Sequence, residues 1–234
     1  MFGKIASIET MGLVDGPGIR TVIFMQGCPL RCLYCHNPEM QDFKSNTKKY
    51  TPKQVVEILK KYKSYYGKTG GVTFSGGEPL SQGKFLLECL KLCKTEGINT
   101  ALDTSGIGSD YDEILNLVDL VILDVKACEK EEYARLTGGN FDIFLKFLNA
   151  CQHKKKNLWI RQVIVPGIND DKEHILRLKE FLKPIKKVER VELLPYHTMA
   201  KEKYRVLNRS YPLGDTPEMN EIRCKELEKL LKEE

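Results

Sequence analysis

Short apolar runs rich in β-branched residues alternate along this chain with longer amphipathic segments. The short runs predict six strands, at 21–26, 72–74, 100–102, 120–123, 158–165 and 190–194. The longer segments predict helices near 52–66, 81–96, 111–118, 141–155 and 171–182, and a polar C-terminal helix over about 216–233. Regular alternation of strand and helix predicts an α/β fold in which parallel strands are covered by helices.

The number of strand-helix units limits the possible architectures. About six βα units are too few to close an eight-stranded barrel, so we expect an open, partial TIM-type barrel. A doubly wound flat sheet remains the alternative. No Gly/Ser-rich or Pro-rich linker divides the chain. We therefore expect residues 1–234 to form one domain, with a core over about 15–200.

Local signals mark the ends of two predicted helices. Thr51, followed by Pro52 and by Gln54 three residues after the threonine, predicts an N-cap with a capping box. Gly97 predicts the C-terminal end of the second helix.

Composition and charge exclude several classes of function. The chain has 234 residues, 41% of them hydrophobic, which is enough for one sizeable core. No apolar run approaches the roughly 20 residues that span a bilayer, and no signal-peptide pattern begins the chain. The net charge is +5, with both signs interspersed. We expect a cytoplasmic protein that acts on neither membranes nor nucleic acid.

Three of the eight cysteines stand within eight residues, directly after the first predicted strand: Cys28, Cys32 and Cys35. Closely spaced thiolates bind soft metals, which leaves zinc or an iron-sulfur cluster. A structural zinc site needs four ligands, and only His36 stands near enough to complete one. Three thiolates on a 4Fe-4S cluster would leave one iron open for chemistry. The spacing favours the cluster, and a non-catalytic zinc module remains the alternative.

The other five cysteines show no spacing typical of metal ligands. We expect no function for them beyond that of small buried apolar side chains. They are Cys89, Cys93, Cys128, Cys151 and Cys224.

Polar and glycine residues follow the other predicted strands, at the edge where parallel βα arrays bind ligands. Gly76, Gly77 and Glu78 follow the second strand, and Asp103 and Asp124 end the third and fourth. Two carboxylates at one edge repel each other unless a cation lies between them, and Lys126 offers one. A solvated network of ion pairs is the alternative for these three charges.

Two basic residues on later strands carry further chemistry. Arg161 interrupts an apolar strand, where an inward-facing cation needs a partner or an anionic ligand; a place on the outer face is the alternative. His197 follows the last strand in the segment Pro195, Tyr196, His197. A lone histidine at such a position says little by itself.

The cysteine spacing CxxxCxxC, with Tyr34 before the last cysteine, resembles the signature of the radical S-adenosylmethionine (SAM) superfamily. The segments 15–20 and 27–38 resemble, more narrowly, the activases of glycyl radical enzymes. The resemblance implies the radical SAM fold and an oxidoreductase whose 4Fe-4S cluster binds SAM and cleaves it reductively. The product is a 5′-deoxyadenosyl radical, which abstracts a hydrogen atom from a glycine Cα of a partner enzyme.

The resemblance also implies roles for individual residues. Cys28, Cys32 and Cys35 would hold the cluster. Positions matching SAM contacts are Tyr34, His36, Gly76, Gly77, Glu78, Lys126 and His197. A monovalent cation, Na⁺ or K⁺, would lie beside the SAM carboxylate on Asp103, Thr104, Asp124 and the backbone carbonyl of Ile122. Asp15 and Arg161 match positions that meet the substrate peptide.

The resemblance finally implies partners. Many activases of this family carry a ferredoxin-like insert with extra clustered cysteines, and none occurs between Asn37 and Gly71. That absence favours pyruvate formate-lyase as the protein substrate, and another glycyl radical enzyme, peptide or small molecule remains the alternative. With no second cluster motif in the sequence, we expect the electron to come from a reduced flavodoxin or ferredoxin.

Overall fold

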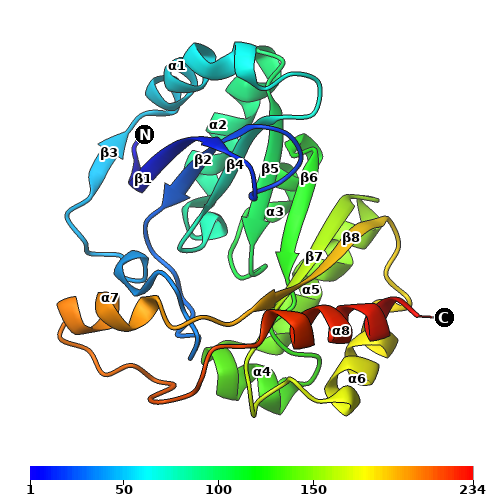
Figure 1. Ribbon diagram of the computed structural model, residues 1–234. Helices are drawn as coiled ribbons and strands as arrows, with labels where there is room; N and C mark the ends of the chain where they lie inside the picture. Colours follow the sequence, from blue (N-terminus) through cyan, green and yellow to red (C-terminus); the bar gives the residue numbers. More distant parts are fainter. Residues whose placement is uncertain (234) are drawn as a thin grey trace.

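Six parallel strands follow one another across the sheet in chain order. They are β2 (Arg20–Met25), β4 (Gly71–Gly76), β5 (Asn99–Thr104), β6 (Leu120–Asp124), β7 (Asn157–Ile164) and β8 (Val188–Pro195) in the computed structural model, which describes residues 1–233. All six predicted strands are confirmed. Because the order never reverses, right-handed crossovers place the connecting helices on one side of the sheet (Figure 1). A doubly wound sheet would reverse its order, so the partial barrel is confirmed.

Two further strands extend the edge of the sheet and were not predicted from the sequence. β1 (Gly3–Gly12) pairs antiparallel with β2, and β3 (Lys48–Tyr50) pairs antiparallel with β1. The register of β1 shifts between Ile5 and Ser7 and again between Glu9 and Gly12. These irregularities break the period of two by which a half-buried strand is recognised.

Helices cover the outside of the curved sheet (Figure 1). Those that match predicted ones are α1 (Pro52–Tyr62), α2 (Gly83–Thr95), α3 (Tyr111–Leu117), α5 (Phe141–His153), α6 (Lys172–Leu182) and α8 (Glu221–Lys232). The capping box of Thr51 and Gln54 is confirmed. Gly97 takes a φ of +63° just after α2, as its predicted role requires. Among residues 1–233, no helix is long and apolar enough to cross a membrane.

Several helical segments differ from the prediction. The short helices α4 (Lys130–Thr137) and α7 (Ala200–Val206) were not predicted. The expected helix at 81–96 begins as a 3-10 turn over Pro79–Gln82, and α8 begins at Glu221 rather than near 216. Helices of two turns show too few periodic positions to stand out in the sequence.

The two faces of the sheet bury different side chains. The outer face packs against the helices in one apolar cluster that runs from Ile5 to Leu231. The inner face holds a small separate cluster of Ala101, Leu120 and Ile122, with Trp159 against it. Neighbouring residues of a strand point to opposite faces, so β5, β6 and β7 contribute to both clusters.

Arg20 fills the inner face near the start of the strands. Its side chain is completely buried, and its Nε donates to Thr73 Oγ1 (2.7 Å) and its Nη2 to the carbonyl of Val72 (2.7 Å). A further bond, from Nη2 to Asn99 Oδ1, is 3.1 Å long. Burial lowers the pKa of the guanidinium to about 10, which still leaves it charged at neutral pH. Arg20 thus fills the interior at the start of the strands. The polar opening of the barrel lies at the opposite end, where the strands finish.

Candidate active site

The carboxyl ends of the parallel strands surround a cavity of about 340 Å³. This volume is within the range of small-molecule sites. Most of the residues singled out in the sequence line it: Asp15, Cys28, Cys32, Tyr34, Cys35, His36, Gly76, Gly77, Asp103, Thr104, Asp124, Lys126 and Arg161. The fold thus gathers residues that are up to 146 positions apart, from Asp15 to Arg161, around one space.

The three clustered cysteines lie on the loop after β2. The backbone N–H groups of Arg31 and Leu33 donate to the carbonyls of Thr137 (2.7 Å) and Leu136 (2.9 Å) at the end of α4, which fixes this cluster loop (residues 27–37). Burial raises the pKa of the Cys28 thiol to about 12 and that of Cys32 to about 11. These thiols need a bound cation to become thiolates, and a metal centre supplies it.

The arrangement of these thiols fits a cluster better than a single ion. All three line the same cavity. Within residues 1–233, however, no three His, Cys, Asp or Glu side chains converge as ligands of one metal ion. A cubane holds its thiolates on three different irons, so they need not meet at one point.

Gly77 brings the end of β4 against the cluster loop. A Cβ placed on Gly77 would lie 2.4 Å from the carbonyl oxygen of Gly27 and 2.8 Å from that of Met40. Gly76, with a φ of +110°, adopts a conformation that favours glycine. The glycine pair thus allows two backbones to touch beside the cysteines and leaves polar backbone groups open to the cavity.

Glu78 lies beneath the cavity and is completely buried. Its carboxylate accepts hydrogen bonds from the Thr104 hydroxyl (2.6 Å), the Ser105 hydroxyl (2.5 Å), the Ser105 N–H (2.8 Å) and the Leu80 N–H (3.0 Å). Burial raises the pKa of Glu78, and these four donors oppose that effect. The side chain therefore ties the end of β4 to the end of β5, and a direct contact of Glu78 with SAM stays a prediction.

Two carboxylates stand at neighbouring strand ends, and only one has a cation paired with it. Lys126 Nζ lies 2.8 Å from Asp124 Oδ2 and 5.7 Å from the centre of the Tyr34 ring. Burial opposes the charge of Lys126, but Asp124 holds its pKa well above the usual value. Asp103 accepts a 2.7 Å hydrogen bond from Ser75, and burial together with Asp124 raises its pKa to about 6.

Arg161 points into the barrel, as its place in an apolar strand predicts, with 8% of the residue exposed. Its Nε lies 3.1 Å from Glu192 Oε2, and its Nη2 donates to the carbonyl of Val14 at 2.5 Å. The next residue, Asp15, has its pKa raised by burial and lowered by Arg161 and Arg20. Arg161 therefore ties the β1–β2 loop, which leaves the sheet where β2 begins, to the inner face of β7.

Two histidines form a stacked pair beside the cavity. The ring centroids of His36 and His197 are 3.8 Å apart and their planes differ by 17°. Burial and the neighbouring His197 lower the pKa of His36 to about 4, so its ring is neutral at pH 7. His36 Nε2 and His197 Nδ1 are buried without a hydrogen-bond partner in the protein. Such atoms fit a site that is completed by a ligand with polar groups of its own.

The sequence analysis assigned no individual role to several residues that line the cavity. Ser75 and Ser105 orient Asp103 and Glu78, and the apolar wall contains Phe24, Val163 and Leu194. Val163 stands two positions after Arg161 on β7. Because residues two apart on a strand face the same side, the sequence could have predicted that Val163 faces the cavity with Arg161. Two residues predicted for the site, Ile122 and His197, are not among those that line the cavity. Ile122 belongs to the inner apolar cluster, and His197 reaches the site by stacking on His36.

Comparison with known proteins gives this site a family. The model of the Radical SAM superfamily matches residues 22–178. The chain is 49% identical over 235 residues to the pyruvate formate-lyase-activating enzyme of Clostridium pasteurianum, covering 100% of this chain and 98% of that protein. It is 40% identical to the enzyme of the same name from Staphylococcus epidermidis, covering 96% of this chain and 93% of that protein.

Solved structures agree on the fold. A domain of a pyruvate-formate lyase-activating enzyme from Bacteroides vulgatus superimposes with a TM-score of 0.57 at 26% identity, over 70% of this chain and 93% of that chain. A radical SAM methyltransferase from Sphaerobacter thermophilus reaches a TM-score of 0.66 over 95% of this chain and 65% of that chain. At 16% identity, the second likeness shows the fold alone.

The chain therefore belongs to the radical SAM superfamily and, within it, to the family of the pyruvate formate-lyase-activating enzymes. Membership implies a 4Fe-4S cluster and SAM. This decides between the two metals that the cysteine spacing left open, in favour of iron and sulfur.

Proposed function

We propose that this protein activates pyruvate formate-lyase by generating a glycyl radical on it. The observation that carries the proposal is the meeting of three cysteine thiols with the polar ends of the parallel strands around one cavity. Full-length relatives that share 40–49% identity carry the name of this activity. When bound, the cluster and SAM together supply a 5′-deoxyadenosyl radical, which takes a hydrogen atom from a glycine Cα.

The chain's own residues position and shield this chemistry. Cys28, Cys32 and Cys35 would hold three irons and leave the fourth facing the cavity. Gly76 and Gly77 offer backbone groups to the amino end of SAM, and the His36–His197 pair offers a flat polar surface to its adenine. Glu78 keeps the ends of β4 and β5 together from beneath. Holding the reacting groups close together and away from water is the main contribution of such a site.

A monovalent cation on Asp103, Thr104, Asp124 and the carbonyl of Ile122 belongs to this proposal. Support comes from the charge of the site: Lys126 pairs with Asp124, whereas among the described residues Asp103 has a hydrogen bond from Ser75 and the charge of Arg161 nearby, but no ion pair within 4.0 Å. A cation here would lower the raised pKa of Asp103 and place a positive charge next to the SAM carboxylate. Tighter SAM binding in K⁺ or Na⁺ than in a bulky organic cation, at equal ionic strength, would support it.

Asp15 and Arg161 are proposed to meet the substrate. Both line the cavity, and the β1–β2 loop that carries Asp15 exposes Leu13 and Val14. A glycine-bearing peptide segment entering the open barrel would pass these residues on its way to the cluster.

The proposed activity is tested by electron paramagnetic resonance (EPR). The anaerobic, reconstituted protein is mixed with SAM, a photoreduced deazaflavin and pyruvate formate-lyase, with a Cys32→Ala variant as the control. A glycyl doublet on pyruvate formate-lyase, absent from the control, supports the proposal. Methionine and 5′-deoxyadenosine formed without the doublet would instead indicate another substrate for the same chemistry.

A further inference from the structure

Each turnover of the proposed chemistry needs one electron from outside the chain. Cys28, Cys32 and Cys35 form the one cysteine group that lines the cavity. The remaining five cysteines are dispersed over α2, the loop before α4, α5 and α8. An electron carrier must therefore approach the surface next to the cluster loop.

The exposed arginines of the described chain differ in whether a carboxylate lies close enough to form an ion pair. Half of them lie within 4.0 Å of a carboxylate oxygen, namely Arg190, Arg205 and Arg223. Among residues 1–233, three exposed arginines take part in no such ion pair: Arg31, Arg135 and Arg209. All three surround the cluster loop.

Backbone and side-chain contacts place these three arginines together. Arg31 stands between Cys28 and Cys32, and its Nη1 donates to the carbonyls of Cys28 and Leu30, both at 2.7 Å. Arg135 belongs to the last turn of α4, the turn that receives the backbone N–H groups of the cluster loop.

Arg209 completes the group from the other side of the loop. It donates to Gln41 Oε1 (2.8 Å) just beyond the cluster loop and lies over the ring of Tyr204 at 5.2 Å. Burial raises the pKa of Tyr204 to about 12, Cys35 raises it further, and Arg209 and Arg31 lower it. Arg209 is thus held between the ring of Tyr204 and Gln41, next to the cluster loop.

Apolar side chains are exposed around α7, which precedes Arg209 in the chain. Around α7 the described chain exposes Met199 (71%), Val206 (69%) and Leu207 (38%). Helices α4 and α7 both lie in the lower half of Figure 1, toward which the arrowheads of the parallel strands point. A mixture of unpaired arginines and exposed apolar groups is typical of a protein interface. We define this arginine face as Arg31, Arg135, Arg209, Met199, Val206 and Leu207.

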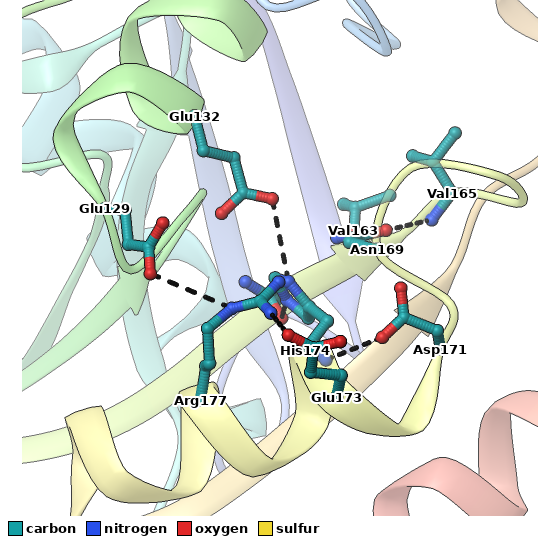
Figure 2. Close-up of polar contacts among 10 residues, drawn as sticks. Glu129, Glu132, Val163, Val165, Asn169, Asp171, Glu173, His174 and Arg177 are labelled. Atoms are coloured by element: carbon teal, nitrogen blue, oxygen red, sulfur yellow. Dashed lines mark hydrogen bonds and ion pairs between the residues drawn. The ribbon is translucent and has the colours of Figure 1, made fainter.

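The arginine face is held on a fixed support. Figure 2 shows that Glu132 and Glu129 of the α4 region point toward His174 and Arg177 of α6. The Glu132–His174 distance is 3.6 Å and the Glu129–Arg177 distance is 3.9 Å. Because α4 is tied to α6 at its start and to the cluster loop at its end, Arg135 keeps its place relative to the cysteines.

We propose that the arginine face is the docking surface for an acidic, low-potential one-electron carrier protein. The proposal rests on the proposed function, which requires the electron. Charge complementarity selects the occupant, since unpaired guanidinium groups attract carboxylates and speed up the encounter. In the docked complex one electron passes to the oxidised cluster, the carrier loses one electron, and no covalent bond forms or breaks at this step. Asp15 and Arg161 line the cavity on the β1–β2 loop and on β7, and neither segment carries a residue of the arginine face, so carrier and substrate can be bound at once.

The test compares two double charge reversals of equal size. Arg135→Glu with Arg209→Glu alters the arginine face. Lys53→Glu with Lys61→Glu alters exposed positions of α1, at the opposite end of the molecule (Figure 1). Arg31 is left in place because it holds carbonyl groups of the cluster loop. The probe is a fully reduced flavodoxin with an acidic surface, and cluster reduction is followed by stopped-flow absorbance at low ionic strength.

Each rate is divided by the rate with photoreduced deazaflavin, which needs no docking. We expect this ratio to fall by about tenfold or more for the arginine-face variant and to stay within about twofold of wild type for the α1 variant. We also expect salt to slow the flavodoxin reaction of the wild type more than that of the arginine-face variant.

Equal ratios for the two variants would overturn the proposal, as would a wild-type rate that does not respond to salt. A failed glycyl doublet with deazaflavin as the reductant would count against the proposed function and not against the docking surface.

Discussion

Arg161 and Val14 are joined by a hydrogen bond that spans 147 residues of sequence, from a guanidinium Nη2 to a backbone carbonyl. The bond fixes the β1–β2 loop against the inner face of β7, and Asp15, the residue after Val14, lines the cavity. Replacing Arg161 by Gln removes a charged hydrogen bond worth roughly 1.5–3 kcal/mol. We expect glycyl-radical formation to fall by about tenfold or more, because the released β1–β2 loop would no longer position the substrate peptide.

The Arg161→Gln variant also distinguishes an effect on substrate positioning from an effect on SAM cleavage. SAM cleavage in the absence of protein substrate should change much less, and Arg190→Gln, on the exposed partner of Glu192, should leave both rates near wild type. Equal losses of both activities in Arg161→Gln would contradict a role confined to the substrate side.

Glu78 offers a second prediction, on stability. Its carboxylate accepts four hydrogen bonds in a completely buried position. Glu78→Gln turns one acceptor into a donor facing other donors, and we expect it to lower the free energy of unfolding by about 2–4 kcal/mol. Glu88→Gln, on an exposed pair of α2, should change it little. Anaerobic urea unfolding measures both, and a Glu78→Gln protein as stable as the Glu88→Gln protein would contradict this account.

His174 predicts a pH dependence of stability. The ring is fully buried, and burial together with Arg177 lowers its pKa, while Asp171 opposes this. Gln162 faces its Nε2 at 3.0 Å. Glu132 faces its Nδ1 at 3.6 Å (Figure 2). With a lowered pKa in the folded state, the unfolded chain takes up the proton first, so stability is lost as pH falls below about 6.5.

The matched comparison uses His174→Gln. Burial raises the pKa of Glu132, which works in the opposite direction but is present in both proteins. We expect any stability advantage of wild type over His174→Gln to shrink between pH 7 and pH 5, and the exposed His153→Gln to show no such trend. Parallel pH profiles for wild type and His174→Gln would show that the buried ring keeps its ordinary pKa.

Gly77 predicts a steric effect on metal loading. A methyl group there would meet two carbonyl oxygens at 2.4 and 2.8 Å, so the cluster loop would have to move. We expect Gly77→Ala to bind much less iron after reconstitution. Gly167→Ala is the control, because nothing lies within 4 Å of its Cβ position, although its φ of +74° makes alanine mildly strained. Full iron content in Gly77→Ala would mean that the close approach is not needed.

The periodic parts of the fold were predictable, and the irregular parts were not. Buried parallel strands such as β6 are continuous apolar runs, so the sequence reveals them directly. The bulged strand β1 and the two-turn helices α4 and α7 depend on tertiary contacts. Leu33 and Arg31, for example, need the carbonyls that end α4, and no local pattern records that pairing.

The candidate site likewise has a part that the sequence predicted and a part that it did not. Asp103 and Asp124 were found because parallel strands bring their ends to one edge, whatever lies between them in sequence. Arg161 was found because it interrupts an apolar strand. The enclosure of Glu78 by Thr104 and Ser105 was not foreseen, because it depends on how two loops fold over each other. The sequence predicted a carboxylate, Glu78, at this strand end, but it did not predict which atoms the carboxylate contacts.

Iron and sulfide content, measured with low-temperature EPR of the reduced protein, tests the central claim most directly. Wild type and Cys151→Ala, which changes a buried cysteine of α5, should each bind about four iron and four sulfide per chain and show a reduced-cluster signal that shifts when SAM is added. Cys32→Ala should lose the iron, the signal and methionine release. One zinc per chain in the wild type, or an unchanged cluster in Cys32→Ala, would contradict the account.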